Sequence, residues 1–322
     1  MATRRSRELT EQEIVDFLSD LFWAAYRKAP FEVLCAVLRV SGMQDADWDP
    51  FEESKAAFED YNALLRLDKD QLSDAGRWRV GLQMYCQAVE MTAPQELLAN
   101  LLRILGGAKH HLKPFGSLGR SNKKKPFSWV PPSAPVKYRE LKRLAIKCNQ
   151  PVLVDFIDHF FNEDIRNAFS HSDYVLSAEH FRWTESGLAQ QMPLDAVNLT
   201  VRNCFRFFSG VLWLHDKVLR DLKMLPRFHK WPNYEVLELL SDSERLHGFS
   251  VHFSNGAKAT YSRTNQGIEC TNVMFESDGS INFFVGSLDA LCREWKVNGK
   301  PYEEQSNRTI ERDAPEAARP SS

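Results

Sequence analysis

Hydrophobic side chains recur every three to four positions through most of the first two thirds of the chain, which is the spacing of one buried face of an α-helix. The first segment of this kind begins with Thr10 and Glu13, which have the spacing of a capping box, and stops at Pro30. The same spacing predicts helices over 76–91 and 93–105, and two glycines that suit a helix end follow the second. We therefore expect the amino-terminal third of the chain to be helical.

Residues 107–134 break this pattern, because they are rich in proline, glycine and basic residues. Proline at this density prevents a continuous helix, so we predict a long basic loop. Helical spacing returns over 136–146 and over 152–169. It returns once more after Pro193, where it extends over about 28 residues and predicts the longest helix of the chain.

The period changes to two after Pro232. Hydrophobic residues alternate before an Asn-Gly pair at 255–256 and after an Asp-Gly pair at 278–279, and both pairs are typical of tight hairpins. We predict a small antiparallel β-meander over 247–286 and a closing helix over 287–295. The fold class that follows is mainly α-helical, with a β-meander near the C-terminus.

The predicted organisation has five parts. They are an N-terminal helical region at 1–106, a basic Pro/Gly-rich loop at 107–134, a helical core at 135–231, a β-meander with its closing helix at 244–296, and a flexible polar tail at 303–322.

Composition and charge narrow the classes of function. Hydrophobic residues make up 43% and charged residues 26% of the 322 residues, a balance that excludes a wholly disordered or fibrous chain. No apolar run approaches the roughly 20 residues that cross a bilayer, and the first residues lack the apolar stretch of a signal peptide. We therefore expect a cytoplasmic protein with no membrane contact.

The net charge of -2 conceals an uneven distribution. Residues 103–147 contain twelve Lys and Arg and one acid, so this segment is +11 and the remainder is -13. Its aromatic residues stand among the cations, a combination that suits a single RNA strand through stacking and phosphate attraction. A solvated loop that is neutralised by the acidic remainder is the alternative interpretation. The residues that we predict to contact RNA are Lys109, Lys113, Arg120, Lys123, Lys124, Lys125 and Trp129.

Cofactor and metal motifs are missing from the sequence. The six cysteines lie far apart with no C-x-x-C pair, so no zinc ribbon can form locally, and we expect buried, reduced thiols. No P-loop and no G-x-G-x-x-G occurs. His159 and Glu163 are one helical turn apart, but no third metal ligand can be named. We predict neither a cofactor nor a metal site.

Arg166 and His171 are the residues with the clearest catalytic chemistry. A guanidinium holds a phosphate through its planar fork, and an imidazole exchanges protons near neutral pH. Together they meet two requirements of metal-independent phosphodiester cleavage. If the helix continued through both residues, their side chains would lie about 140° apart around the axis and about 7.5 Å apart along it. They can converge only where the helix breaks near Ser170, or where a second copy of the chain supplies one of them.

Arg166, Asn167 and His171 give the chain a resemblance to the HEPN family of helical-bundle ribonucleases, whose signature is Arg, usually followed by a polar residue, and then His four to six positions after the Arg. The resemblance covers about 135–223. It implies a homodimer in which both Arg and His sets meet in one cleft, and it implies RNA cleavage without metal to a cyclic phosphate and a 5′-hydroxyl. Many members of the family act in phage defence or as toxins, which implies a protein partner that inhibits or activates the nuclease.

The resulting hypothesis is a metal-independent endoribonuclease in which His171 is the general acid and base, Arg166 stabilises the phosphate charge and Asn167 orients the pair. Two alternatives remain open. One is a non-catalytic RNA-binding or protein-interaction module that uses the bundle for dimerisation. The other is a structural role in which Arg166 pairs with Glu163 or Asp164 and His171 caps the helix end.

Overall fold

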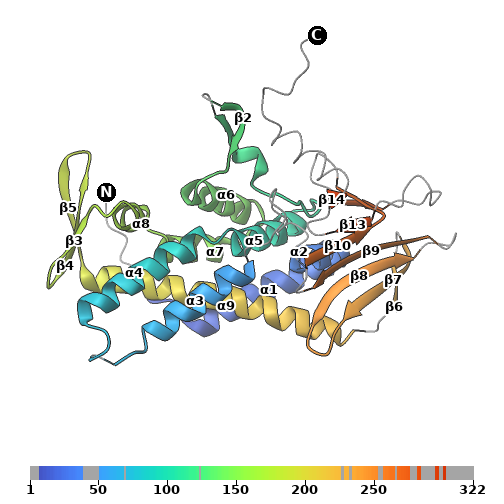
Figure 1. Cartoon of the computed structure of the whole chain (residues 1–322), viewed down its shortest axis with the longest axis horizontal. Helices are drawn as coiled ribbons and strands as arrows, with labels where there is room; N and C mark the ends of the chain where they lie inside the picture. Colours follow the sequence, from blue (N-terminus) through green and yellow to red (C-terminus); the bar gives the residue numbers. More distant parts are fainter. Residues whose placement is uncertain are drawn as a thin grey trace, which may run out of the picture. The chain divides into compact units, whose positions relative to one another are not determined.

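A computed structural model of the chain divides into two compact units (Figure 1). The helical unit comprises Met1–Gly42 and Pro50–Asp216, and the sheet unit comprises Met43–Asp49 and Lys217–Ser322. The residues that the structure describes are 7–38, 51–68, 70–122, 125–225, 228–231, 234–252, 257–264, 267–275, 281–283, 294–296 and 300–301. The protein is mainly α-helical, with antiparallel sheet toward its C-terminus, which confirms the predicted fold class.

The helices follow the hydrophobic periodicity closely. Thr10 caps the first helix, and its hydroxyl accepts a hydrogen bond from the backbone N–H of Glu13 at 3.2 Å, which confirms the predicted start. Pro30 ends this helix and begins the next, because its fixed φ suits a first helical turn. The helices are α1 Glu11–Lys28, α2 Pro30–Val37, α3 Phe51–Leu64, α4 Asp74–Glu90, α5 Thr92–Leu105, α6 Ala134–Lys147, α7 Pro151–Phe160, α8 Glu163–Ser170 and α9 Leu194–Lys223.

The predicted helix over 152–169 is two helices, α7 and α8, and the break falls at Phe161 and Asn162. The Asn162 side chain accepts from the N–H of Ile165 at 2.9 Å and caps α8. Its backbone N–H donates to the Tyr85 hydroxyl of α4 at 2.8 Å, and the hydroxyl donates to the Asn162 carbonyl at 3.1 Å. A tyrosine 77 positions away therefore satisfies the backbone groups that the break releases.

Two small sheets interrupt segments for which we predicted no strands. Within the predicted loop, β1 Arg120–Asn122 and β2 Lys125–Val130 form an antiparallel hairpin after a 3-10 turn, η2 Gly116–Leu118. Pro126 is tolerated in β2 because a two-stranded sheet leaves one edge of each strand unpaired. Within the predicted helical core, β3 Tyr174–Leu176, β4 His180–Glu185 and β5 Leu188–Pro193 form a three-stranded antiparallel sheet, which Figure 1 shows next to α8.

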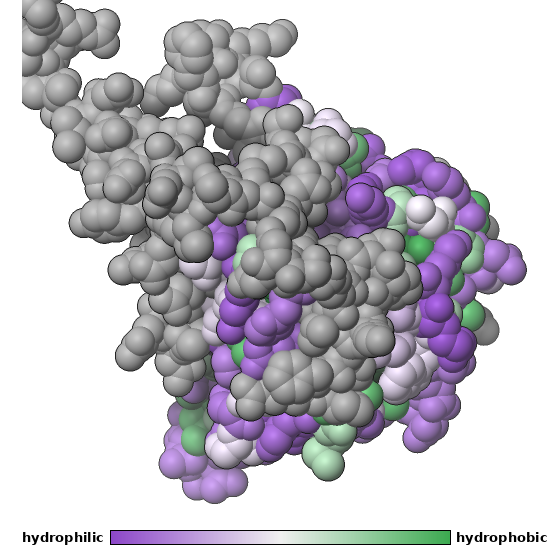
Figure 2. All heavy atoms as spheres, turned by 90° about the vertical axis from the view of Figure 1, so that its right-hand side faces the viewer, coloured by the Kyte–Doolittle hydropathy of each residue, from purple (hydrophilic) through white to green (hydrophobic). Residues whose placement is uncertain are grey.

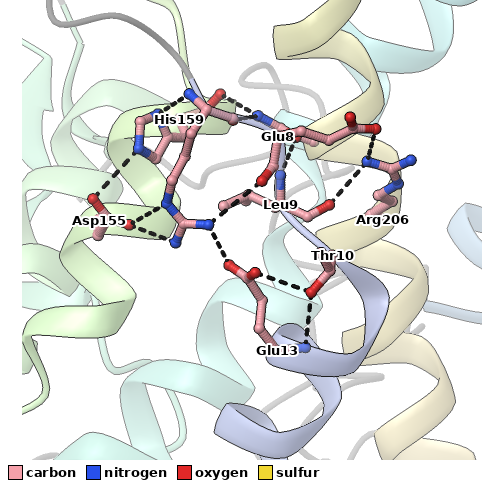
Figure 3. A network of polar contacts seen from close by, with 9 residues as sticks. Glu8, Leu9, Thr10, Glu13, Asp155, His159 and Arg206 are labelled. Atoms are coloured by element: carbon pink, nitrogen blue, oxygen red, sulfur yellow. Dashed lines mark hydrogen bonds and ion pairs between the residues drawn. The ribbon is translucent and has the colours of Figure 1, made fainter.

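A polar network attaches the segment before α1 to α7 and α9 (Figure 3). Leu9 donates its N–H to the Asn203 side chain at 2.9 Å, and the same amide donates to the Arg7 carbonyl at 2.9 Å. Arg206 binds the Glu8 carboxylate at 2.7 Å. Because Asn203 is fully buried, these hydrogen bonds satisfy polar groups that would otherwise be costly to bury.

The core of the helical unit is aromatic where α1, α7 and α9 meet. The rings of Phe17 and Phe156 lie 5.4 Å apart edge to face, and Phe160 stacks on Phe207 at 4.6 Å. Edge-to-face and offset contacts of this kind add to the stabilisation that comes from burying the rings. Of the apolar positions three to four apart that predicted α9, Val197, Val201, Phe208, Leu212, Leu219 and Leu222 are buried, whereas Leu194 and Phe205 are only partly buried.

The sheet unit confirms strands and corrects the predicted limits. Its main sheet is antiparallel, in the order β14-β13-β10-β9-β8-β7-β6. The strands are β6 Phe228–Trp231, β7 Tyr234–Ser241, β8 Leu246–His252, β9 Lys258–Thr264, β10 Gly267–Thr271, β13 Glu294–Lys296 and β14 Lys300–Pro301, and β11 Val273–Phe275 pairs separately with β12 Ile281–Phe283.

The predicted closing helix does not reach Trp295, which pairs with Cys270 as part of β13. An alternation of three residues is too short to identify such a strand from sequence. The rest of that predicted helix, at 287–293, and the predicted tail at 303–322 lie outside the described residues.

Four described cysteines are buried, which confirms the prediction for them: Cys35, Cys86, Cys204 and Cys270. Cys148 is partly exposed, and Cys292 lies outside the described residues. No helix in the described part of the chain is both long and apolar enough to cross a bilayer. On the face drawn in Figure 2, hydrophilic residues cover most of the coloured surface and hydrophobic ones form small separate groups.

Candidate functional site

The candidate site is built on α8, a helix of 8 residues that packs against α4 through one apolar side. Ile165 and Ala168 are buried on that side, and the Asn162 cap fixes where the helix begins. Arg166 and Asn167 are partly exposed, and His171 is exposed immediately after the last turn. The local sequence thus places all three predicted catalytic residues on one short, anchored helix and its end.

Arg166 is held by a residue that the sequence analysis did not identify, Glu90 at the end of α4. The guanidinium Nε donates to Glu90 Oε1 at 2.7 Å, and Nη2 lies 2.5 Å from the same oxygen. The predicted alternative partners, Glu163 and Asp164, are not the carboxylates bound to Arg166. The pair spans 76 positions of sequence, so no local spacing could have revealed it.

The Asn167 side-chain oxygen accepts from Arg166 Nη1 at 2.8 Å, so Asn167 contacts one of the two side chains that it is predicted to orient. Two of the five guanidinium N–H groups therefore donate hydrogen bonds, Nε to Glu90 and one N–H of Nη1 to Asn167, while Nη2 makes an ion-pair contact with Glu90. The remaining N–H groups are donors of the kind that bind phosphate oxygens.

His171 ends α8, and its backbone N–H donates to the Asn167 carbonyl at 3.0 Å. Within the described part of the chain, its imidazole has no hydrogen bond or ion pair. The next residues turn sharply, because Ser172 has a positive φ of 57°, and the chain then enters β3. An exposed imidazole without a structural partner is available to exchange a proton with a bound molecule.

The break after Ser170 does not bring the two predicted catalytic side chains together. His171 still makes the helical hydrogen bond to Asn167, and an ideal helix would place the side chains of Arg166 and His171 about 140° apart. No hydrogen bond joins them among the described residues. The end of α8 near Ser170 therefore does not by itself join Arg166 to His171, and a second copy of the chain is the route that remains.

Cys86 of α4, which faces α8, is not a reactive thiol. The Cys86 thiol lies 3.8 Å from the Arg166 carbonyl, and burial raises the pKa of Cys86 to about 11, while a hydrogen bond to Ser170 opposes this. The thiol is therefore protonated at neutral pH and is not a nucleophile.

The basic segment contains both exposed cations and residues that are buried or paired within the protein. Lys109, Lys113 and Arg120 are exposed, as RNA contact requires. Lys123 and Lys124 lie outside the described residues, and Lys125 and Trp129 belong to β2.

Several other members of this basic segment are engaged within the protein. Phe115 and Tyr138 are buried in the core, so the expectation that they stack on RNA is wrong. Tyr138 lies on the inner face of α6 and donates to the Val89 carbonyl at 3.1 Å. Lys137 is buried as well, and Arg143 pairs with Glu140 at 2.7 Å.

Metal ligands do not gather in the described part of the chain, where no group of three or more His, Cys, Asp or Glu could hold an ion. His159 faces Asp155, at 3.4 Å, rather than Glu163, and it accepts the Arg7 N–H in the network of Figure 3. It is thus a buried structural histidine.

Comparisons with protein-family models, curated proteins and solved structures found no match to the chain.

Proposed function

We propose that this protein is a metal-independent endoribonuclease that acts as a homodimer. The proposal rests on how the structure holds Arg166 and exposes His171. Arg166 is held by Glu90 and Asn167, and His171 presents an exposed imidazole that has no hydrogen bond or ion pair among the described residues. These are the two groups that phosphodiester cleavage through the ribose 2′-hydroxyl requires.

In the proposed reaction, a neutral His171 removes the proton from the 2′-hydroxyl, and the 2′-oxygen attacks phosphorus. The P–O5′ bond breaks, and the departing 5′-oxygen takes a proton from an imidazolium, which leaves a 2′,3′-cyclic phosphate and a 5′-hydroxyl. Arg166 binds two non-bridging oxygens and stabilises the negative charge that develops on them. No oxidant, cofactor or metal takes part.

The homodimer accounts for the separation of Arg166 and His171 on α8. In a two-fold arrangement, His171 of one copy approaches Arg166 of the other, and two imidazoles are present to serve as base and acid. The exposed cations Lys109, Lys113 and Arg120 are proposed to attract the RNA backbone. The motif resemblance supports the same arrangement. A role as a toxin or in phage defence, under control of a protein partner, belongs to this proposal.

The test is RNA cleavage in EDTA by the purified wild type, Arg166→Ala and His171→Ala. Removing the general acid and base His171 lowers the rate by about 10²- to 10⁴-fold, and removing the charge-stabilising Arg166 lowers it by about 10²- to 10³-fold, so we expect both variants to be nearly inactive. Arg182→Ala and His180→Ala are matched controls, because they remove the same residue types from the nearby β4. Both controls should cut RNA at the wild-type rate.

The assay also decides between the enzyme and a non-catalytic module. An inert wild type that still binds RNA supports the binding module and contradicts the nuclease. Wild-type cleavage by Arg166→Ala or His171→Ala would assign the activity to another site. If an inhibitory partner holds the chain silent, expression of the wild type alone should arrest growth, and His171→Ala should abolish that arrest.

A further inference from the structure

Glu90 occupies an electrostatically unfavourable place. It is the last residue of α4, where the helix dipole disfavours a negative charge, and the last turn of α4 carries no basic residue. An acid in this position needs cations from elsewhere in the fold. Two of them are close: Arg166 of α8, through two contacts to one carboxylate oxygen, and Lys137 of α6.

Lys137 is a buried cation whose charge interacts with that of Glu90. Burial lowers the pKa of Lys137, and the negative charges of Glu96 and Glu90 oppose that change. Its ammonium donates to the Thr92 hydroxyl at 2.8 Å, at the start of α5. Glu90 therefore feels positive charge from two helices, α6 and α8.

Two side chains hold the guanidinium of Arg166. Glu90 Oε1 accepts from Nε at 2.7 Å and lies 2.5 Å from Nη2, and the Asn167 side-chain oxygen accepts from Nη1 at 2.8 Å. Contacts to all three guanidinium nitrogens restrict the rotation of the group, and N–H groups that make no hydrogen bond among the described residues remain for phosphate oxygens.

We infer that Glu90 is a positioning residue for the phosphate clamp of the proposed nuclease. It acts through Arg166, whose guanidinium it orients, and it does not touch the RNA. This inference rests on the proposed function. It predicts that Glu90 contributes to the rate of cleavage rather than to the affinity for RNA, because a phosphate meets the same cation in the variant but meets it in many orientations.

The kinetic test compares Glu90→Ala and Glu90→Gln with the wild type in EDTA. We expect Glu90→Ala to lower kcat by about ten- to hundredfold with KM changed by less than about twofold, since misplaced catalytic groups cost rates of this order. Glu90→Gln retains an oxygen that can accept from Arg166, so its kcat should lie between the two. Glu163→Gln is the matched control, because it removes an exposed acid from α8 that does not hold Arg166.

Two outcomes would overturn the inference while the wild type cuts RNA. Wild-type kcat in Glu90→Ala would show that Arg166 needs no orienting group. Tighter RNA binding and faster cleavage in both Glu90 variants would show that the carboxylate competes with phosphate for the clamp. An inert wild type contradicts the proposed function itself, so the two failures are distinguishable.

A measurement without catalysis tests the positioning directly. The ¹H–¹⁵N signal of Arg166 Nε, assigned by its loss in Arg166→Lys, should be separate from the exposed arginines and should shift when a 2′-deoxy oligonucleotide that cannot be cut is added. In Glu90→Ala this signal should move to the position of solvent-exposed arginines. Because thermal melting reports any general loss of structure, a shifted signal at an unchanged Tm identifies lost orientation. An unchanged signal in Glu90→Ala would overturn the inference.

Discussion

His110 makes the stability of the helical unit dependent on pH. Its side chain is 3% exposed, and burial, followed by the charges of His111 and Arg103, lowers its pKa to about 3. In an unfolded chain the pKa of histidine is about 6.5. The folded state therefore keeps His110 neutral in a range where the unfolded state binds a proton.

The sign and the magnitude follow from this difference. The contribution is complete above pH 6.5 and is lost as the pH falls toward 3, because protons then favour the unfolded chain. At pH 5 the unfolded histidine is about 97% protonated and the folded one about 1%. The free energy of unfolding should therefore be about 2 kcal/mol lower at pH 5 than at pH 8 because of this residue alone.

The assay is urea unfolding, followed by circular dichroism at 222 nm, for the wild type and His110→Gln at pH 8, 6 and 5. The variant lacks the titrating group, so its free energy of unfolding should fall about 2 kcal/mol less than that of the wild type between pH 8 and pH 5. Phe115→Leu, a core change in the same segment, should lower stability by the same amount at every pH. Parallel pH profiles for the wild type and His110→Gln would refute the buried, neutral imidazole.

Two further predictions concern the α7–α8 junction and the basic hairpin. Tyr85→Phe should lower the free energy of unfolding, measured by urea unfolding, by about 1–3 kcal/mol, because the Asn162 N–H loses its acceptor. A change under about 0.5 kcal/mol would show that another group satisfies this N–H. Replacing Lys123, Lys124 and Lys125 by Gln should weaken RNA binding and lower the slope of log K against log salt by about 2, and an unchanged slope would remove these residues from the RNA contact.

Sequence periodicity predicted the helices that rest on local signals. The Thr10 cap, the proline that follows α1 and the stripe of α9 all lie within a few positions of the structure that they determine. The break at Asn162 could not be found in this way, because the group that satisfies it, Tyr85, is 77 positions away.

The three-stranded sheet was missed although its turn carries a signal. Ser186 and Gly187 both adopt positive φ, at 49° and 79°, as a two-residue hairpin turn requires. Phe181 and Trp183 alternate in β4, but this alternation is too short to outweigh the helices on either side.

Part of the candidate site was visible in the sequence. The spacing of Arg166, Asn167 and His171 identified the helix that carries it, and ideal helix geometry gave the angle between the side chains. Glu90 was invisible because its role depends on the packing of α4 against α8. Charge counting likewise treated Lys137 as part of a basic surface, whereas the face of α6 on which it lies is turned inward.

The attachment of Leu9 to Asn203 has a consequence for biosynthesis. These partners are 194 positions apart, so α1 cannot complete its contacts until the ribosome has made much of α9. At about 5–20 residues per second, the nascent amino-terminal helix waits roughly 10–40 s for its partner. During that interval the side of α1 at Ile14 and Leu18, which lies against Gly210 of α9, lacks its partner, and chaperones that recognise exposed apolar surface should bind the growing chain there.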